Sequence, residues 1–345
     1  RRVLFRSIDK YGGSYSDSDF HNWTFGSDTD WYKELLRTAI ISNHSLGITG
    51  GSEKATYSLG MSYLYQDGVM DVKNNYKRLN FRAALDYDAT SWLKIGFSSV
   101  VSISNQVLPN NSAWQQAFNA PSIYPVYDAN NTSTFPDKYA SPSSIGFTSN
   151  FYNPVATANY FNSKNDSHQY LTNLYAQINL IPEKLNIKTS VNYNYQSING
   201  KVFTPTYYVS SWQQNTTTSL TKSTTSYDNY IWDNIMTYRD SYGQHNFGAM
   251  LGMSMRQEKY RFLSGTAVNV PEGKEEYQYL SQGNSTGITL SDNGSTYRGL
   301  SYFARLNYDY DDRYYVAGSF RRDGSSRLSP DNRWGNFWSV SGMWH

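Results

Sequence analysis

The sequence has no cysteine and no long apolar run, and both absences narrow what the chain can be. Without cysteine there is no disulfide framework and no thiolate chemistry. A membrane-spanning helix needs about 18 or more consecutive apolar residues, and no such run occurs. A transmembrane β-barrel stays possible because its strands alternate apolar and polar side chains, which agrees with a mean hydropathy of −0.65.

Sequence motifs for catalysis, metal binding and nucleic-acid binding are also missing. The five histidines show no metal-ligand spacing, and there is neither a Gly-x-Ser-x-Gly elbow nor a glycine-rich phosphate loop. Residues 292–295 resemble part of a calcium loop but lack the other ligands, so we interpret them as a turn. The net charge is only +2, and the basic and acidic residues are interspersed, so the sequence shows no basic patch for binding nucleic acid. We expect no enzyme, no cofactor, no metal site and no nucleic-acid partner.

Aromatic side chains are abundant, with 32 Tyr, 16 Phe and 9 Trp, and this composition favours strands and turns. Alternation with a period of two recurs along the chain and is clearest from Arg78 to Asp88, where one face is apolar and the other polar or charged. The pattern predicts about eleven strands, most of them near the ~9–11 residues that cross a bilayer: 44–50, 55–66, 76–88, 92–106, 169–181, 184–197, 227–240, 244–256, 298–310, 313–322 and 336–345.

The connections between these strands alternate between short and long. The short ones are 51–54, 89–91, 182–183, 241–243 and 311–312, and the long ones are 67–75, 107–168, 198–226, 257–297 and 323–335. Outer-membrane barrels have short periplasmic turns and long extracellular loops, so the alternation predicts which end faces the cell exterior. We expect an all-β, antiparallel transmembrane β-barrel fragment that forms an open curved sheet. The alternatives are a soluble β-sandwich lectin, an adhesin-like surface domain and a passive porin.

The two ends of the chain predict that it is part of a longer protein. There is no initiator Met or signal peptide, and the sequence stops within a strand-like pattern. Residues 1–7 (RRVLFRS) resemble the translation of a sequencing adapter, which predicts an artefactual tail. We expect residues 8–43 to be a loop and entry segment and residues 44–345 to be the partial barrel.

Several motifs resemble those of SusC/RagA-type TonB-dependent outer-membrane transporters of Bacteroidetes. Near the N-terminus the resemblance is carried by residues 47–57 (GITGGSEKATY), 63–69 (YLYQDGV) and 76–78 (YKR). Near the C-terminus it is carried by residues 302–308 (YFARLNY), 321–326 (RRDGSS) and 334–341 (WGNFWSVS). Two further segments resemble the family more weakly, namely residues 121–128 (PSIYPVYD) and 153–156 (NPVA). The resemblance extends from about Thr29 to the C-terminus.

This resemblance implies a barrel of about 22 strands, of which about 11 are present here, in the outer membrane of a Gram-negative cell. It also implies an N-terminal plug, energised by TonB-ExbB-ExbD through a TonB box, and a SusD-like surface lipoprotein that captures glycans or, less commonly, peptides. We expect the plug domain and the TonB box to be absent from this chain. The implied function is active import of large nutrients, chiefly glycans.

Candidate site residues divide into loop aromatics, a polar run and charged residues of the strands. The loop aromatics offer flat rings that can stack on sugars, although the commoner role is to pack the loops together or to lie in the interfacial aromatic girdle: Trp114, Phe118, Tyr124, Tyr127, Tyr207, Tyr208 and Trp212. The polar run, a feature of the family signature, is interpreted as a turn in which Gly324 adopts an unusual conformation and Asp323 caps its own backbone: Arg321, Asp323, Gly324, Ser325 and Ser326. The charged residues of the predicted lumenal face are expected to pair with one another or with the plug, and the alternative is that they guide the substrate: Arg78, Arg82, Asp86, Lys94, Lys188, Arg305 and Asp309.

The expected open sheet leads to a prediction for the isolated polypeptide. Its two unpaired edge strands and its lipid-facing side chains should make it aggregate in buffer without detergent. Light scattering of the refolded chain, with and without detergent, measures this. A folded monomer in plain buffer would count against a membrane barrel.

Overall fold

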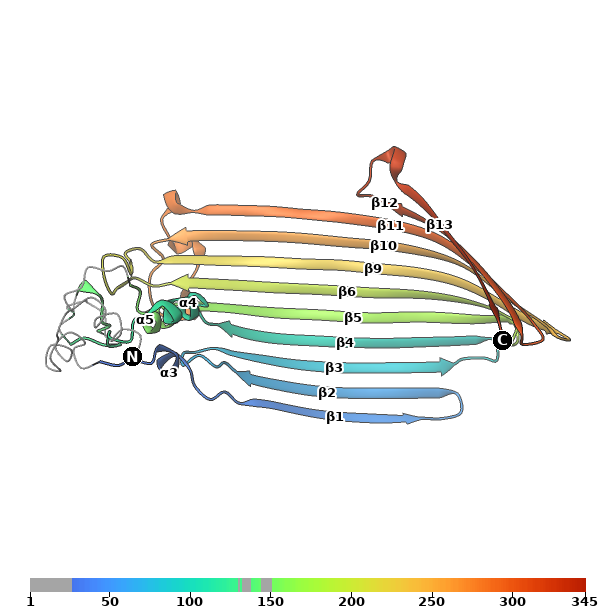
Figure 1. The fold of residues 1–345 in the computed structure, drawn as a ribbon, viewed down its shortest axis with the longest axis horizontal. Coiled ribbons are helices and arrows are strands. Elements are labelled where there is room, and N and C mark those ends of the chain that lie inside the picture. The colour runs from blue at the N-terminus through green and yellow to red at the C-terminus, as the bar shows by residue number, and fades with distance from the viewer. Residues whose placement is uncertain (1–26, 130, 132–137, 144–150) are drawn as a thin grey trace, which may run out of the picture.

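Eleven long strands form one open antiparallel sheet, in which each strand pairs with the next long strand along the chain (Figure 1). The computed structural model describes residues 27–129, 131, 138–143 and 151–345. The expectation of about eleven antiparallel strands in an open sheet is confirmed. The strands are β1 (Ile41–Gly51), β2 (Ala55–Asp67), β3 (Asn75–Asp88), β4 (Leu93–Leu108), β5 (Asn162–Ile181), β6 (Leu185–Thr204), β9 (Ser219–Tyr242), β10 (His245–Val268), β11 (Thr289–Tyr310), β12 (Tyr314–Ser325) and β13 (Trp334–Trp344). The adapter-like residues 1–7 lie outside the described part.

Short turns join the strands at one end of the sheet, and the described helices lie in or before the long connections at the other end (Figure 1). The tight turns use the left-handed backbone conformation, with φ of 63° at Glu183, 58° at Gly243, 53° at Asp311 and 49° at Asp312. Glycine and aspartate tolerate this conformation, which matches the twist of a hairpin. The long connections carry α4 (Ser112–Asn119), α5 (Pro154–Asn159), the small hairpin β7 (Tyr207–Tyr208) and β8 (Gln214–Asn215), and the 3₁₀ turns η2 (Glu275–Tyr277), η3 (Leu280–Gln282), η4 (Ser285–Gly287) and η5 (Pro330–Asn332). Helix α3 (Trp31–Leu35) precedes β1.

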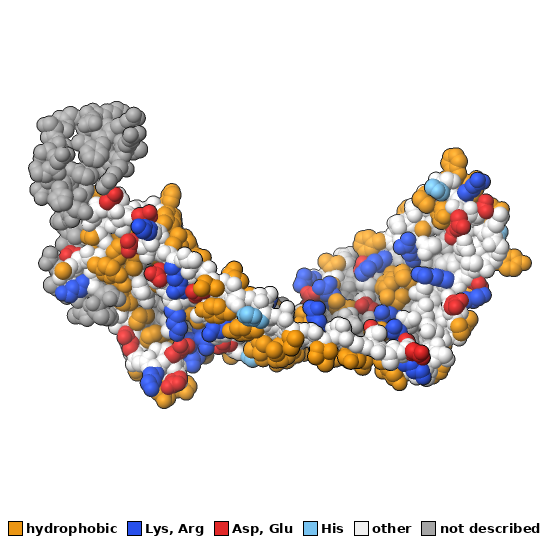
Figure 2. Space-filling view, turned by 90° about the horizontal axis from the view of Figure 1, so that it is seen from below, with side chains coloured by type: hydrophobic (Ala, Val, Ile, Leu, Met, Phe, Trp, Pro, Cys, Tyr) orange, Lys and Arg blue, Asp and Glu red, His pale blue; other side chains and the backbone are white. Residues whose placement is uncertain are grey.

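The strand register places most of the apolar side chains of the eleven strands on one face. Directly paired residues of antiparallel strands share a face, so each pairing carries the apolar row to the next strand. At β2 and β3 the row joins Met61 to Phe81, and at β9 and β10 it joins Met236 to Leu251. It ends at the pair formed by Phe320 and Trp338. Many of these side chains are exposed, and Figure 2 shows hydrophobic groups along the lower margin of the thin middle of the molecule.

The apolar row has the height of a bilayer core. On β10 the outward side chains are apolar from Phe247 to Met255, and the outward residues that follow are Gln257, Lys259 and Arg261. These eight residue steps span about 27 Å along the strand, or about 21 Å normal to the membrane at a tilt of ~40°. The band of outer-membrane barrels is about 25 Å tall. We call this surface the apolar belt.

Several strands continue toward the long loops well beyond the predicted limits. The strand predicted at 227–240 is β9 (Ser219–Tyr242), and those predicted at 244–256 and 298–310 are β10 (His245–Val268) and β11 (Thr289–Tyr310). The additional residues are largely polar and show little apolar alternation, so strand pairing extends the ladder. Buried Phe203, Leu220 and Ala267 pack together at its upper end. The interpretation of residues 292–295 as a turn is wrong, because they lie within β11 and pair with β10.

The long loops have a packed core of their own. Helices α3, α4 and α5 and the segment at Val209 bring together buried Trp31, Leu35, Tyr124 and Phe151. The rings of Tyr124 and Phe151 stack with centroids 4.9 Å apart. No helix of the described residues is long and apolar enough to cross a membrane.

Two buried amide side chains connect these loops. The backbone N–H of Asn153 donates to Gln213 Oε1 at 2.8 Å, and Gln213 Nε2 donates to the Asn153 carbonyl at 2.9 Å. The Asn153 side chain also caps α5 through the backbone N–H groups of Val155 and Ala156 and donates to the Val126 carbonyl at 2.8 Å. Because a buried polar group without a partner costs free energy, this network holds the loop after β4 against the loop after β6.

The face assignment can be tested with two neighbouring residues. In the full-length parent protein, Leu251→Arg should destabilise the folded barrel by about 2–4 kcal/mol, because it places a cation in the bilayer core. Met250→Arg, one residue away on the polar face, should cost much less. Urea-dependent folding into lipid vesicles measures both, and equal losses for the two variants would contradict the assignment.

The loop network predicts a local loss of order. Gln213→Ala leaves the backbone groups of buried Asn153 without partners and should cost about 1–3 kcal/mol in the loop region. The matched control is Gln214→Ala, since the Gln214 side chain is exposed and donates only to the Ser211 carbonyl. Limited proteolysis of the full-length protein should cut within residues 107–161 and 205–218 faster in the first variant only. Equal cleavage rates in both variants would show that the network does not hold the loops.

Candidate functional site

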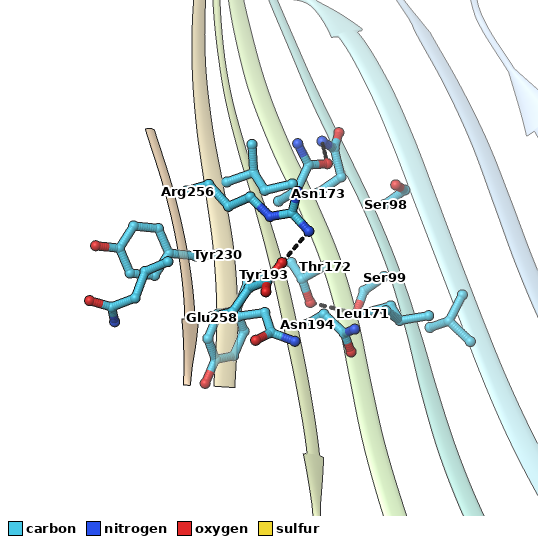
Figure 3. A pocket seen from close by; sticks show the side chains of 15 residues that line it. Ser98, Ser99, Leu171, Thr172, Asn173, Tyr193, Asn194, Tyr230, Arg256 and Glu258 are labelled. Atoms are coloured by element: carbon cyan, nitrogen blue, oxygen red, sulfur yellow. Dashed lines mark hydrogen bonds and ion pairs between the residues drawn. The ribbon is translucent and has the colours of Figure 1, made fainter. Parts of the chain in front are cut away.

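The polar face of the sheet, opposite the apolar belt, carries a wall of amide and hydroxyl side chains. Direct pairing places Ser98, Asn173 and Asn192 side by side on β4, β5 and β6. The next row up joins Asn194 of β6 to Asn229 of β9, and apolar Leu171 of β5 lies beside Asn194 in the same row. These residues border a hollow of about 340 Å³ that extends to Arg256 and Glu258 of β10 (Figure 3). We call this surface the amide wall.

Hydrogen bonds between the amides fix their orientation without using all their capacity. Asn173 Nδ2 donates to Asn192 Oδ1 at 2.6 Å, and Gln169 Nε2 donates to Asn194 Oδ1 at 3.5 Å. A side-chain amide offers two N–H donors and an oxygen with two lone pairs, so one such bond leaves further donors and acceptors. Beside them, Arg256 and Glu258 form an ion pair, which offsets their charges. The wall therefore presents a nearly neutral set of donors and acceptors.

The charged residues of the polar face bond mostly to neutral groups. Asp86 accepts a hydrogen bond from the Tyr175 hydroxyl, and Lys188 Nζ lies 4.3 Å from the centre of the Tyr175 ring. Asp309 accepts from Asn246 Nδ2 at 2.6 Å, and Arg305 donates to Asn307. Within the described residues, no ion pair joins two of these charges, because glycines, amides and hydroxyls occupy most of the facing positions. Their pairing with a plug stays a prediction.

The loop aromatics separate into packed and exposed side chains. Tyr124 is buried in the loop core, with Trp114 and half-buried Tyr207 packed against it. Burial raises the pKa of the Tyr207 hydroxyl, and its ring stacks on Tyr160 at 4.6 Å. Tyr127 stacks on Tyr139 at 5.3 Å. Four of the rings are exposed, with exposed fractions of 77% for Phe118, 61% for Trp212, 56% for Tyr127 and 41% for Tyr208.

The polar run at the end of β12 is strand and not turn. Asp323 and Ser325 pair with Ser301 and Gly299 of β11, and the Asp323 carboxylate accepts from Arg321 Nε at 2.7 Å. Gly324 is not among the residues with positive φ. A Cβ there would come within 3.0 Å of the Trp334 ring, so glycine leaves room for that ring. The turn interpretation is therefore wrong. Ser326 follows the strand, and its hydroxyl accepts from the Arg298 backbone N–H.

Sequence reasoning missed the amide wall, although a signal was present. Asn192 and Asn194 occupy the polar positions that alternate with Val191, Tyr193 and Tyr195 in β6. A polar alternate position is normally interpreted only as facing water. Their grouping with Asn173 and Asn229 requires the strand register, because these residues lie far apart along the chain.

Comparison with known proteins gives a consistent result. No family model matches the chain. It is 26% identical over 344 residues to TonB-dependent receptor P3 of Formosa agariphila, covering 96% of this chain and 33% of that protein. It is 25% identical to TonB-dependent receptor SusC of Bacteroides thetaiotaomicron, covering 92% and 32%. The chain thus spans about a third of the length of these relatives, which are named as receptors and not as enzymes.

A solved structure supports the same fold. The chain aligns with a structure of the RagAB peptide transporter at a TM-score of 0.75 and 20% identity, covering 98% of this chain and 40% of that one. The open meander, the apolar belt and the loop asymmetry agree with such a barrel. The chain therefore has the fold of an outer-membrane β-barrel segment and is similar in sequence to TonB-dependent receptors, SusC among them.

Proposed function

We propose that this chain forms part of the wall of an active importer for large, neutral, hydroxyl-rich nutrients, and that these are oligosaccharides. The observation that carries the proposal is the amide wall, which presents oriented donors and acceptors to a hollow of about 340 Å³. Sugar hydroxyls both donate and accept, as side-chain amides do, so a neutral amide surface suits them. Many such bonds of about 0.5–1.5 kcal/mol each hold a ligand without trapping it.

The exposed rings of the loop end support the same substrate class. Phe118, Tyr208 and Trp212 lie in the connections at the end of the sheet that faces the cell exterior. Flat rings exposed to water stack well on the apolar faces of sugars. Peptides are the second candidate, because the structurally similar RagAB is named a peptide transporter and amides also bond to peptide groups.

Import of this kind requires partners. We propose a SusD-like surface lipoprotein that docks over the loop end and delivers the substrate, and energy from TonB-ExbB-ExbD acting through a plug. The packed loop core supports the first partner, since its buried amide network gives the loops a defined surface. Relatives named TonB-dependent receptors support the second.

The test is uptake by the full-length parent protein. Asn173→Ala, Asn192→Ala and Asn194→Ala combined should raise the apparent KM for oligosaccharide uptake about tenfold or more, because each lost hydrogen bond contributes about 0.5–1.5 kcal/mol. Labelled oligosaccharides of defined length, supplied to a strain lacking the native importer, give the measurement. The level of protein in the outer membrane is determined in parallel.

A matched control separates the wall from general damage. Asn105, Asn199 and Asn336 lie on the opposite face of β4, β6 and β13, and their triple alanine variant should leave uptake unchanged. Loss of peptide uptake with unchanged oligosaccharide uptake in the first variant would assign the wall to peptides. Unchanged uptake of both would overturn a role for the wall in transport.

A further inference from the structure

The outward face of the sheet changes from apolar to cationic directly above the apolar belt on β10 and β11. On β10 the outward residues after Met255 are Gln257, Lys259 and Arg261, and on β11 the outward residue after Leu300 toward the loops is Arg298. Arg261 and Arg298 are exposed, and Lys259 is half-buried. We call Lys259, Arg261 and Arg298 the outer basic cluster.

The register makes these three residues neighbours. Gln257 pairs with Arg298 and Lys259 pairs with Thr296, so Arg298 and Lys259 occupy diagonal positions on adjacent strands. Such positions lie about 7–8 Å apart, and Arg261 follows Lys259 at a similar spacing on the same face. One phosphorylated headgroup can therefore reach more than one of them.

Acidic residues on this face offset only part of the charge of the cluster. Arg298 Nε donates to Gln257 Oε1 at 3.1 Å, which is a neutral partner. Within the described residues, none of the ion pairs joins Lys259, Arg261 or Arg298 to a carboxylate. Asp228 of β9 lies directly opposite Lys259, and Asp292 of β11 lies diagonal to Arg261 on the same face. Three cations face these two carboxylates, so the cluster keeps a net positive charge.

The height of the cluster matches the headgroup layer. It begins one outward position above the last apolar residues of the belt, Met255 and Leu300. The rings of Tyr302 on β11 and Trp334 on β13 stack with centroids 6.2 Å apart, and the guanidinium of Arg322 on β12 lies 5.0 Å from the Trp334 ring. Aromatic rings with cations beside them are typical of the level where hydrocarbon meets headgroups.

We propose that the outer basic cluster binds the phosphate groups of an anionic lipid in the outer leaflet. Guanidinium groups bind phosphate through paired, charge-assisted hydrogen bonds, and the lysine adds a mobile point charge. The lipid chains lie against the apolar belt below, so headgroup and tails meet matching surfaces of the same strands. This site lies on the lipid-facing side of the wall and is independent of the substrate that passes the other side.

Lipid retention by the full-length parent protein tests the proposal. The protein, purified in a neutral detergent, is mixed with phosphatidylglycerol or with phosphatidylcholine, and bound lipid is counted by native mass spectrometry. The unaltered protein should retain phosphatidylglycerol at least tenfold more than phosphatidylcholine. The combined variant Lys259→Gln, Arg261→Gln and Arg298→Gln should lose this preference. Equal retention of both lipids by the unaltered protein would overturn the proposal even if the variant did not fold.

The control makes the same charge change on the other face. Arg78→Gln, Arg82→Gln and Arg305→Gln combined should keep the lipid preference, because these side chains face the polar side. If this control also loses the preference for phosphatidylglycerol, the preference reflects overall charge, and the proposed lipid site is contradicted. Inorganic phosphate at millimolar concentration should not displace the lipid, and displacement would show a free-phosphate site instead. Both outcomes are read from bound lipid and do not depend on nutrient uptake.

Discussion

The structure depends on one constraint, which is that backbone polar groups inside a bilayer must find partners within the protein. An unpaired N–H or C=O group in hydrocarbon costs several kcal/mol, so strands that cross a membrane must pair continuously. The eleven-strand meander meets this requirement between β1 and β13. Register follows from the same condition, because a slip by one residue would turn the apolar belt inward and the amide wall toward lipid.

Because neighbouring residues of a strand face opposite sides, one sheet serves two environments. Leu251 faces the apolar belt, and Met250 faces the polar side one residue earlier. The same separation places Asn192 and Asn194 on the substrate side that we propose, while Tyr193 between them faces outward. Above the belt the outward positions no longer need to be apolar, and there Lys259 and Arg261 occur.

The loop end follows a different physical rule. Its segments lie beyond the bilayer and have water available, yet Asn153 and Gln213 are buried and fully engaged. Their bonds and the stacking of Tyr124 on Phe151 make the loops a packed body above the strands. A defined surface of this kind suits docking of a partner, whereas the exposed Phe118 and Trp212 suit contact with a ligand.

The sequence by itself determined the strands of the membrane zone, the tight turns between them and the end that carries the long loops. Apolar alternation from Arg78 to Asp88 is visible without any partner, because the bilayer demands it of each strand separately. The upper part of β9, from Ser219, is polar apart from buried Leu220, so only pairing with β6 and β10 shows that it is strand. The polar run at Asp323 and Gly324 has the composition of a turn, and the ladder with β11 overrides that local preference.

The tertiary structure alone decided that Tyr124 is buried while Trp212 is exposed, since both are aromatic residues of long loops. It also decided that Asn173, Asn192 and Asn229 form one wall, because register joins residues that lie far apart along the chain.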